Sequence, residues 1–315
     1  MAEFQFQDRR SFLKYVIGSS FALSSLNGLS ANILNNKDLT KLVILYTNDQ
    51  HSRIEPFPDN DPKFSNQGGF ARRAAVINKI RSVEQNVLLL DAGDIFQGTP
   101  YFNLYKGEVE YKLMSLMGYD CVTLGNHDFD LGMENISKQM EHAKFDFVCA
   151  NYSFSDTPLE NRIHPFKIYK KGGLKIGIFG LGIELQGLVP EKLYGNTRYY
   201  DPVIKANETA YHLKLKRECD FVICLSHLGY KYDDKKISDL VLAEKSANID
   251  LIIGGHTHTF LEKSVEVKNS MNKIVHITQV GWGGIWLGRM EIVFLRNPKF
   301  FSIESQYYKI IKNQV

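Results

Sequence analysis

The chain contains 315 residues, of which 44% are apolar and 23% are charged, and its net charge is +3. This composition is that of an ordinary globular protein, and the length suits one large domain or two small ones. Proteins that bind nucleic acid normally carry a dense basic stripe, whereas the Lys and Arg residues here are scattered, so we expect no nucleic-acid partner.

The first segment along the chain has the layout of a secretory signal. Arg9 and Arg10 precede a short apolar run at 15–26, and small residues follow at 28 and 30. A charged start, a short apolar run and a small-residue cleavage site come in the order typical of such signals. The paired arginines resemble the twin-arginine signal, which exports folded proteins. The alternative is that this segment forms an amphipathic N-terminal helix of the mature fold.

We therefore expect a twin-arginine-type signal peptide at 1–30, a short linker at 31–40 and one folded domain at 41–315. The mature protein would be periplasmic or otherwise extracytoplasmic. The apolar run of the signal is too short to span a bilayer, and no Cys lies near it to carry a lipid, so we expect no stable membrane anchor.

Eight short runs rich in Val, Ile and Leu continue along the chain. Near-continuous apolar runs of this length suit strands that are buried on both faces. We expect strands at 41–47, 86–92, 120–125, 145–150, 174–180, 220–226, 250–255 and 273–280. Amphipathic segments alternate with these runs, and we expect helices at 72–83, 107–118, 201–218 and 238–248. The alternation predicts an α/β domain with a largely sandwiched sheet.

Several residues in these elements have predictable environments. Gly118 is a favourable helix stop, and Asp201 with Pro202 forms a favourable helix start. Arg72 and Arg73 begin the first helix, where we expect them to be solvated charges. The four cysteines lie in or beside apolar runs without Cys-x-x-Cys spacing, which predicts buried free thiols.

Polar side chains follow five of the apolar runs directly. In an α/β sheet the carboxyl ends of the strands form one crevice in which ligands bind, so these side chains are expected to converge. Carboxylate and neutral imidazole are ligands of divalent transition metals, and Asp-x-His or His-x-His places two side chains on the same side of an extended segment. The residues are Asp49 and His51, Asp94, Asn126 to Asp128, His227, and His256 and His258. The pattern predicts a metal site at one edge of the sheet.

Five ordered motifs extend this pattern and resemble those of the calcineurin-like metallophosphoesterases. Within that family they are similar to the catalytic domain of the 5′-nucleotidase branch, over residues 41 to about 290. The motifs are TNDQHS (47–52), GDIFQGTPYFN (93–103), TLGNHDFDLG (123–132), LSHLG (225–229) and GGHTH (254–258). The resemblance implies that 41–315 is a single metallophosphoesterase domain, a four-layer α/β/β/α sandwich with two divalent metal ions at the strand ends.

The resemblance also implies a set of ligands for each ion. The first ion would take Asp49, His51, Asp94 and His258, and the second would take Asp94, Asn126, His227 and His256. Asp94 would therefore bridge the two ions. Mixed nitrogen and oxygen ligands suit Mn, Zn, Fe or Co, so the identity of the metal stays open. Asn126 is a neutral ligand, and a further carboxylate there would cancel the positive charge that attracts phosphate.

His127 follows a ligand and is not itself expected to bind metal. In the family this histidine stabilises the transition state and protonates the leaving oxygen, as a general acid does. A general acid needs a partner that orients it. The resemblance implies that Asp130 is this partner, and Asp128 is the alternative.

The activity implied by the resemblance is metal-dependent phosphoric ester hydrolysis. A phosphomonoesterase would hydrolyse 5′-nucleotides by in-line attack of a hydroxide that bridges the two ions. The alternatives are a cyclic-nucleotide phosphodiesterase, another phosphate- or sulfur-ester hydrolase on the same core, or a metal-binding subunit that needs a partner chain for activity.

Larger 5′-nucleotidases carry a C-terminal domain that binds the nucleoside, and we expect this chain to lack one, because it ends soon after the catalytic motifs. Two explanations follow for how the small phosphate ester is recognised. A separate chain supplies the missing domain, or loops of this chain, such as 53–69 and 185–200, bind the substrate.

Overall fold

The computed structural model describes residues 39–234, 236–295 and 300–312. The expected signal peptide at 1–30 lies outside these ranges, as does the expected linker up to residue 38. Leu39 and Thr40, the last two residues of that linker, already belong to the first strand. None of the helices in the described ranges is long and apolar enough to cross a membrane.

The first of two large sheets has six strands in the order β14-β13-β1-β2-β3-β4. Strands β1 to β4 are parallel to one another, β13 pairs antiparallel with β1, and β14 pairs antiparallel with β13 at the edge of the sheet. The bounds are β1 (Leu39–Thr47), β2 (Val87–Asp91), β3 (Cys121–Val122), β4 (Asp146–Phe147), β13 (Trp286–Leu295) and β14 (Phe300–Lys309).

The second large sheet also has six strands, in the order β11-β12-β10-β9-β7-β6. Its four central strands are parallel, and an antiparallel strand lies at each edge. The bounds are β6 (Phe166–Lys171), β7 (Leu174–Leu181), β9 (Phe221–Ser226), β10 (Leu251–Gly254), β11 (Val265–Lys268) and β12 (Ile274–Thr278). A separate two-stranded ribbon pairs β5 (Tyr152–Ser153) with β8 (Arg198–Tyr199).

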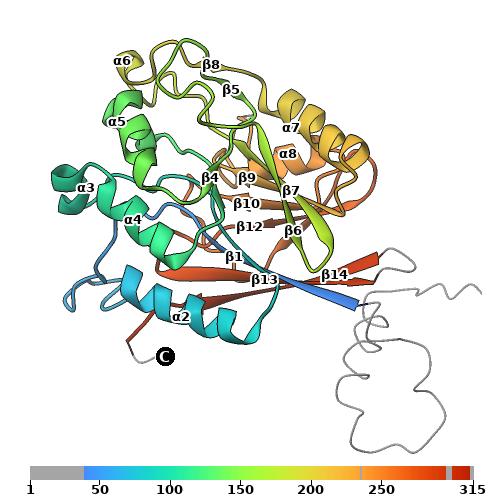
Figure 1. The fold of residues 1–315 in the computed structure, drawn as a ribbon, viewed down its shortest axis with the longest axis horizontal. Helices are drawn as coiled ribbons and strands as arrows, with labels where there is room; N and C mark the ends of the chain where they lie inside the picture. The colour runs from blue at the N-terminus through green and yellow to red at the C-terminus, as the bar shows by residue number, and fades with distance from the viewer. Residues whose placement is uncertain (1–38, 235, 296–299, 313–315) are drawn as a thin grey trace, which may run out of the picture.

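The helices are α2 (Phe70–Val83), α3 (Pro100–Tyr105), α4 (Glu108–Met117), α5 (Gly132–Gln139), α6 (Glu191–Tyr194), α7 (Pro202–Tyr211) and α8 (Asp239–Lys245). Helices α2, α4 and α5 pack on the side of the first sheet, and α7 and α8 pack on the side of the second (Figure 1). The 3-10 turns η3 (His127–Phe129) and η4 (Met140–His142) flank α5, and the π-helical turn η5 (His212–Lys216) continues α7.

Alternation along β1 explains how the layers pack. Val43 and Leu45 face a core cluster that includes Ile77 of α2. Leu42 and Ile44 face a second cluster, which fills the space between the sheets because successive side chains of a strand point to opposite faces. A third cluster lies between the second sheet and the helices α7 and α8. The expected α/β/β/α sandwich is confirmed.

The structure confirms the expected helix signals and corrects one expectation. Gly118 ends α4 in a left-handed conformation, and the Asp201 carboxylate accepts a hydrogen bond from the backbone N–H of Ile204 at the start of α7. All four cysteines are free and buried. The expectation for Arg73 was wrong, because its side chain is fully buried beneath the loop after β1 and its guanidinium lies over the Phe70 ring, 4.3 Å from the centroid.

Candidate metal centre

The carboxyl ends of the central strands of both sheets meet at one edge of the molecule. In the first sheet Thr47 of β1 pairs with Asp91 of β2, so the loops that follow start side by side. In the second sheet Ser226 of β9 pairs with Gly254 of β10 in the same way. The backbone N–H of His256 donates to both carboxylate oxygens of Asp49 at 3.0 Å, which joins the two sets of loops.

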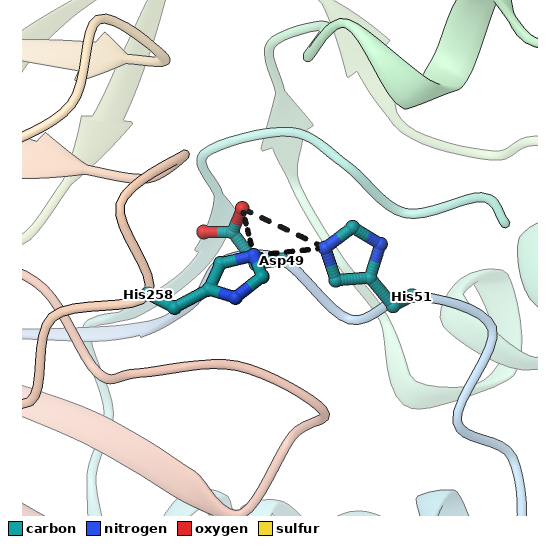
Figure 2. A group of neighbouring side chains, drawn as sticks. All are labelled: Asp49, His51 and His258. Atoms are coloured by element: carbon teal, nitrogen blue, oxygen red, sulfur yellow. Dashed lines mark hydrogen bonds and ion pairs between the residues drawn. The ribbon is translucent and has the colours of Figure 1, made fainter. Parts of the chain in front are cut away.

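Asp49, His51 and His258 form the first group of facing side chains (Figure 2). The Nε2 atoms of His51 and His258 are 3.0 Å apart. The Oδ1 atom of Asp49 lies 3.4 Å from His258 Nε2 and 4.0 Å from His51 Nε2. One carboxylate oxygen and two imidazole nitrogens therefore face a common point, as they would around a metal ion.

Asp94, His227 and His256 form the second group. His227 Nε2 is 3.1 Å from Asp94 Oδ2, and His256 Nδ1 is 2.9 Å from the side-chain oxygen of Asn126. The same Asp94 oxygen lies 4.0 Å from His51 Nε2 in the first group. Asp94 therefore lies between the two groups, and the structure brings together all seven positions expected to bind metal.

The tautomer of His227 shows that this donor set suits a cation. His227 Nδ1 lies 2.7 Å from the carbonyl oxygen of Ala92, which can only accept, so Nδ1 carries a proton. In neutral imidazole the Nε2 lone pair then faces the Asp94 carboxylate, and Nε2 is buried without a hydrogen-bond partner. Two electron-rich atoms in contact need a positive charge between them. Burial lowers the pKa of His227, but Asp94 outweighs it and raises the pKa to about 10, so a proton on Nε2 supplies this positive charge when no metal ion does.

The backbone around the two groups is held in an unusual conformation. Five of the seven residues have φ in the left-handed region, where side chains other than glycine are disfavoured. They are Asp49 (φ 47°), His51 (47°), Asp94 (55°), His256 (70°) and His258 (52°). Strained residues of this kind cluster at functional sites, because the strain persists only where surrounding contacts enforce it.

His127 and Asp130 form a hydrogen-bonded pair beside the first group. Asp130 Oδ2 is 3.0 Å from His127 Nδ1, and this hydrogen bond is the main cause that raises the pKa of His127. The ring centroid of His127 is 5.4 Å from that of His51. The His127 side chain is 39% exposed, so the pair borders the site and remains open to solvent.

Asp128, the alternative partner of His127, has different contacts. Its buried carboxylate accepts hydrogen bonds from the backbone N–H groups of Asp94 (3.0 Å), Ile95 (3.0 Å), Phe96 (3.2 Å) and Gly125 (2.8 Å). It therefore joins the loop that carries Asp94 to the loop that carries Asn126. Of the two carboxylates, Asp130 is the one that contacts His127.

A layer of polar side chains beneath the site was not expected from the sequence. The buried Asp91 carboxylate accepts from Thr47 Oγ1 (2.6 Å) and Gln50 Nε2 (2.8 Å), and burial raises its pKa to about 7. Arg73 hydrogen-bonds the side-chain oxygen of Gln50. These contacts fix the start of the loop that carries Asp49 and His51.

Two further residues support single side chains of the first group. Asn48 Nδ2 donates to Asp49 Oδ2 at 2.6 Å, and Asn48 Oδ1 accepts from the backbone N–H of Val280. The Trp282 ring stacks on the His258 ring, with centroids 5.6 Å apart and an interplanar angle of 12°. Trp282 lies outside the five sequence motifs, so motif spacing does not predict its contact with His258.

Comparison with known proteins agrees with this geometry. The sequence model of the calcineurin-like phosphoesterases matches residues 42–260. The chain is 35% identical over 230 residues to a 5′-nucleotidase of Rattus norvegicus, which covers 70% of this chain and 38% of that protein. It is 33% identical over 294 residues to a snake venom 5′-nucleotidase of Gloydius brevicauda, covering 87% and 48%. The chain thus spans less than half the length of these two relatives.

A solved structure is similar as well. The crystal structure of a 5′-nucleotidase precursor from Thermus thermophilus superposes with a TM-score of 0.76 at 30% identity, covering 86% of this chain and 54% of that one. Because the family model matches more than half of the chain and the fold is shared with this structure, the chain belongs to the calcineurin-like phosphoesterase family.

Proposed function

We propose that the protein is a metal-dependent phosphoric ester hydrolase that removes the phosphate from nucleoside 5′-monophosphates. One observation carries this proposal: the first and second groups of His and Asp side chains lie on either side of Asp94, and the His127–Asp130 pair lies beside them. Relatives named 5′-nucleotidases support the choice of substrate.

In this proposal each group holds one divalent ion, Mn, Zn, Fe or Co. Asp49, His51, Asp94 and His258 would hold the first, and Asp94, Asn126, His227 and His256 the second. When bound, two such ions supply an activated water and neutralise charge on the phosphate during in-line displacement. The hydrogen bond from His227 Nδ1 to the Ala92 carbonyl keeps Nε2 free to act as the ligand atom.

His127 acts as the proton donor in the proposal. Asp130 accepts a hydrogen bond from His127 Nδ1, which leaves Nε2 to carry the proton that goes to the leaving oxygen. The His127 backbone N–H donates to Asp94 Oδ1 at 2.8 Å, so the position of the acid is tied to the shared carboxylate.

The test is a substrate panel with purified, manganese-loaded protein. We expect phosphate release from AMP that chelation abolishes and manganese restores, with little hydrolysis of bis(p-nitrophenyl) phosphate. Turnover of the diester or of a cyclic nucleotide in preference to AMP would replace the proposal with a phosphodiesterase. AMP turnover that needs a second chain would identify a partner that completes the substrate site.

We also propose that residues 1–30 direct export and that the protein acts outside the cytoplasm. Arg9 and Arg10 ahead of the short apolar run support this. The expected result is a mature N-terminus near residue 31 in the extracytoplasmic fraction of the host, and retention in the cytoplasm after Arg9→Lys with Arg10→Lys.

A further inference from the structure

A pocket of about 240 Å³ lies between the loop that follows β7 and the β5–β8 ribbon. We call it the tyrosine pocket, and its walls include Tyr152, Glu184, Gln186, Tyr194, Thr197 and Tyr199. The ribbon and α6 lie at the end of the molecule that also carries α5 (Figure 1). Most of the wall comes from the single segment between β7 and α7.

One wall of the tyrosine pocket starts at the edge of the sheet that carries the candidate metal centre. Leu181, the last residue of β7, pairs with Ser226 of β9, and its carbonyl accepts from the backbone N–H of His227 at 2.8 Å. Glu184 comes three residues after Leu181. The pocket therefore adjoins the strand end that presents His227.

The opposite wall adjoins the His127–Asp130 pair. Phe129 lies between these two residues in sequence, and its ring packs against Tyr152 with centroids 6.2 Å apart. Met133, in the first turn of α5, contacts Thr197 at 3.1 Å between the sulfur and the hydroxyl oxygen. The pocket wall therefore packs against η3 and the start of α5, the segment that also carries His127, which would protonate the leaving oxygen.

The chemistry of the walls selects one kind of occupant. Tyr194 and Tyr199 are partly exposed and offer aromatic faces, on which a planar base stacks. Glu184 and Gln186 are exposed beside them, and offer a carboxylate acceptor and an amide. The Glu184 charge opposes a second phosphate in this place and favours a group that donates hydrogen bonds. A purine with an exocyclic amino group meets both requirements.

We propose that the tyrosine pocket binds the nucleobase of the leaving nucleoside, with the ring between the tyrosines and the amino group donating to Glu184. This inference rests on the proposed nucleotidase function and adds a base-binding site within the described part of the chain. The loop at 185–200 is one of the two loops expected to bind the substrate, and this proposal assigns the nucleobase to it.

The kinetic test compares AMP with ribose 5-phosphate, which shares the phosphate and the sugar and lacks the base. We expect the parent protein to prefer AMP, and Tyr199→Leu to lower kcat/KM for AMP about tenfold more than for ribose 5-phosphate. Glu184→Gln alters an exposed side chain and should fold normally, and we expect it to reduce the preference for AMP over IMP. Tyr211→Leu, on the exposed face of α7, is the matched control. Equal losses for AMP and ribose 5-phosphate would overturn the proposal.

A binding test separates this inference from the proposed function. Adenosine is titrated into the manganese-loaded parent and into both pocket variants by calorimetry, with no turnover involved. Weaker adenosine binding in Tyr199→Leu and Glu184→Gln supports the pocket even if no phosphate ester is hydrolysed. Hydrolysis of AMP with unchanged adenosine binding in both variants means that the enzyme is a nucleotidase and the pocket is not its base site.

Discussion

Asp128 and Asp130 lie two positions apart and make contacts of different kinds. Asp130 is partly exposed and bonds the His127 ring, whereas Asp128 is buried and accepts four backbone hydrogen bonds from two loops. The sequence placed both near His127 but could not distinguish them. The 3-10 turn η3 decides the matter, because it directs one carboxylate to the ring and the other into the protein.

Asp128→Asn should destabilise the fold more than Asp130→Asn. The amide has one acceptor oxygen in place of two, and its NH2 group would face backbone donors that are then buried without partners, at a cost of about 2–4 kcal/mol. Asp130→Asn is the matched control and should cost about 1 kcal/mol or less. Urea unfolding of both variants measures the difference, and equal losses of unfolding free energy contradict the role given to Asp128.

His127→Ala should slow AMP far more than p-nitrophenyl phosphate. The nucleoside alkoxide needs a proton as it leaves, so loss of the general acid should cost 10²- to 10⁴-fold, roughly. The nitrophenolate is a stable anion and leaves without one. Steady-state kinetics gives the ratio, and metal analysis of the variant checks that both ions remain. Similar losses for the two substrates would place His127 outside proton transfer.

The first group of side chains at the site could be located from motif spacing, but its supporting residues could not. Arg73 hydrogen-bonds Gln50 across 23 positions, and Asn48 reaches the backbone of Val280 across 232 positions. Because Arg73 lies near the start of a helix, the local sequence predicts a solvated surface charge. Only the docking of α2 onto the loop after β1 shows that it is buried.

Among the structural elements, the strands between two covered faces were the predictable ones. Strands that are buried on both faces have nearly continuous apolar sequences, which makes them easy to predict. These strands are β1, β2, β7, β9 and β10. The edge strands β6, β11 and β14 were missed because they are partly exposed and their sequences are mixed. β13 was missed because charged residues interrupt its apolar sequence, although most of it is buried.

Those charges belong to an ion-pair cluster that joins three elements. Arg289 of β13 lies 2.7 Å from Glu84, the residue that caps α2, and Lys41 of β1 lies 2.7 Å from the same carboxylate. The Glu84 side chain is only 10% exposed. Burial raises the pKa of Glu84, but Lys41 and Arg289 outweigh burial and hold it below its ordinary value of 4.5.

Glu84→Gln should therefore lower stability in a way that depends on pH. A carboxyl group whose pKa is depressed in the folded state stabilises the fold above its unfolded pKa, and this contribution is lost as the pH falls through the folded value. We expect a loss of about 1 kcal/mol at pH 7 that shrinks below pH 4.5. Urea unfolding across this range is the measurement, with Glu244→Gln, an exposed residue of α8, as a control. A pH-independent loss would mean that packing, not charge, is responsible.

At the scale of the whole molecule, the candidate metal centre lies where the two sheets meet. Asp49, Asp94 and Asn126 come from loops of the first sheet, and His227, His256 and His258 from loops of the second. An ion held by residues of both sheets would link them, in addition to the apolar cluster between them.

Removal of metal should consequently lower the melting temperature. A ligand at 100-fold excess over its Kd stabilises the native state by roughly 2.7 kcal/mol, which corresponds to a shift of about 5 °C or more. Thermal unfolding with chelator and with added manganese measures this shift. It should be much reduced in His258→Ala and retained in His164→Ala, whose exposed side chain lies elsewhere. An equal shift in both variants would place the stabilising ion outside this centre.

The meeting of the two sheets at this edge also governs the order of assembly. The ligands lie as far apart in the chain as Asp49 and His258, so neither sheet alone can present a complete set. A chain whose sheets have not docked would retain metal weakly, and tightly held metal would appear only in molecules that have finished folding. The ratio of bound metal to protein in a preparation would then report the fraction of chains that have reached the native state.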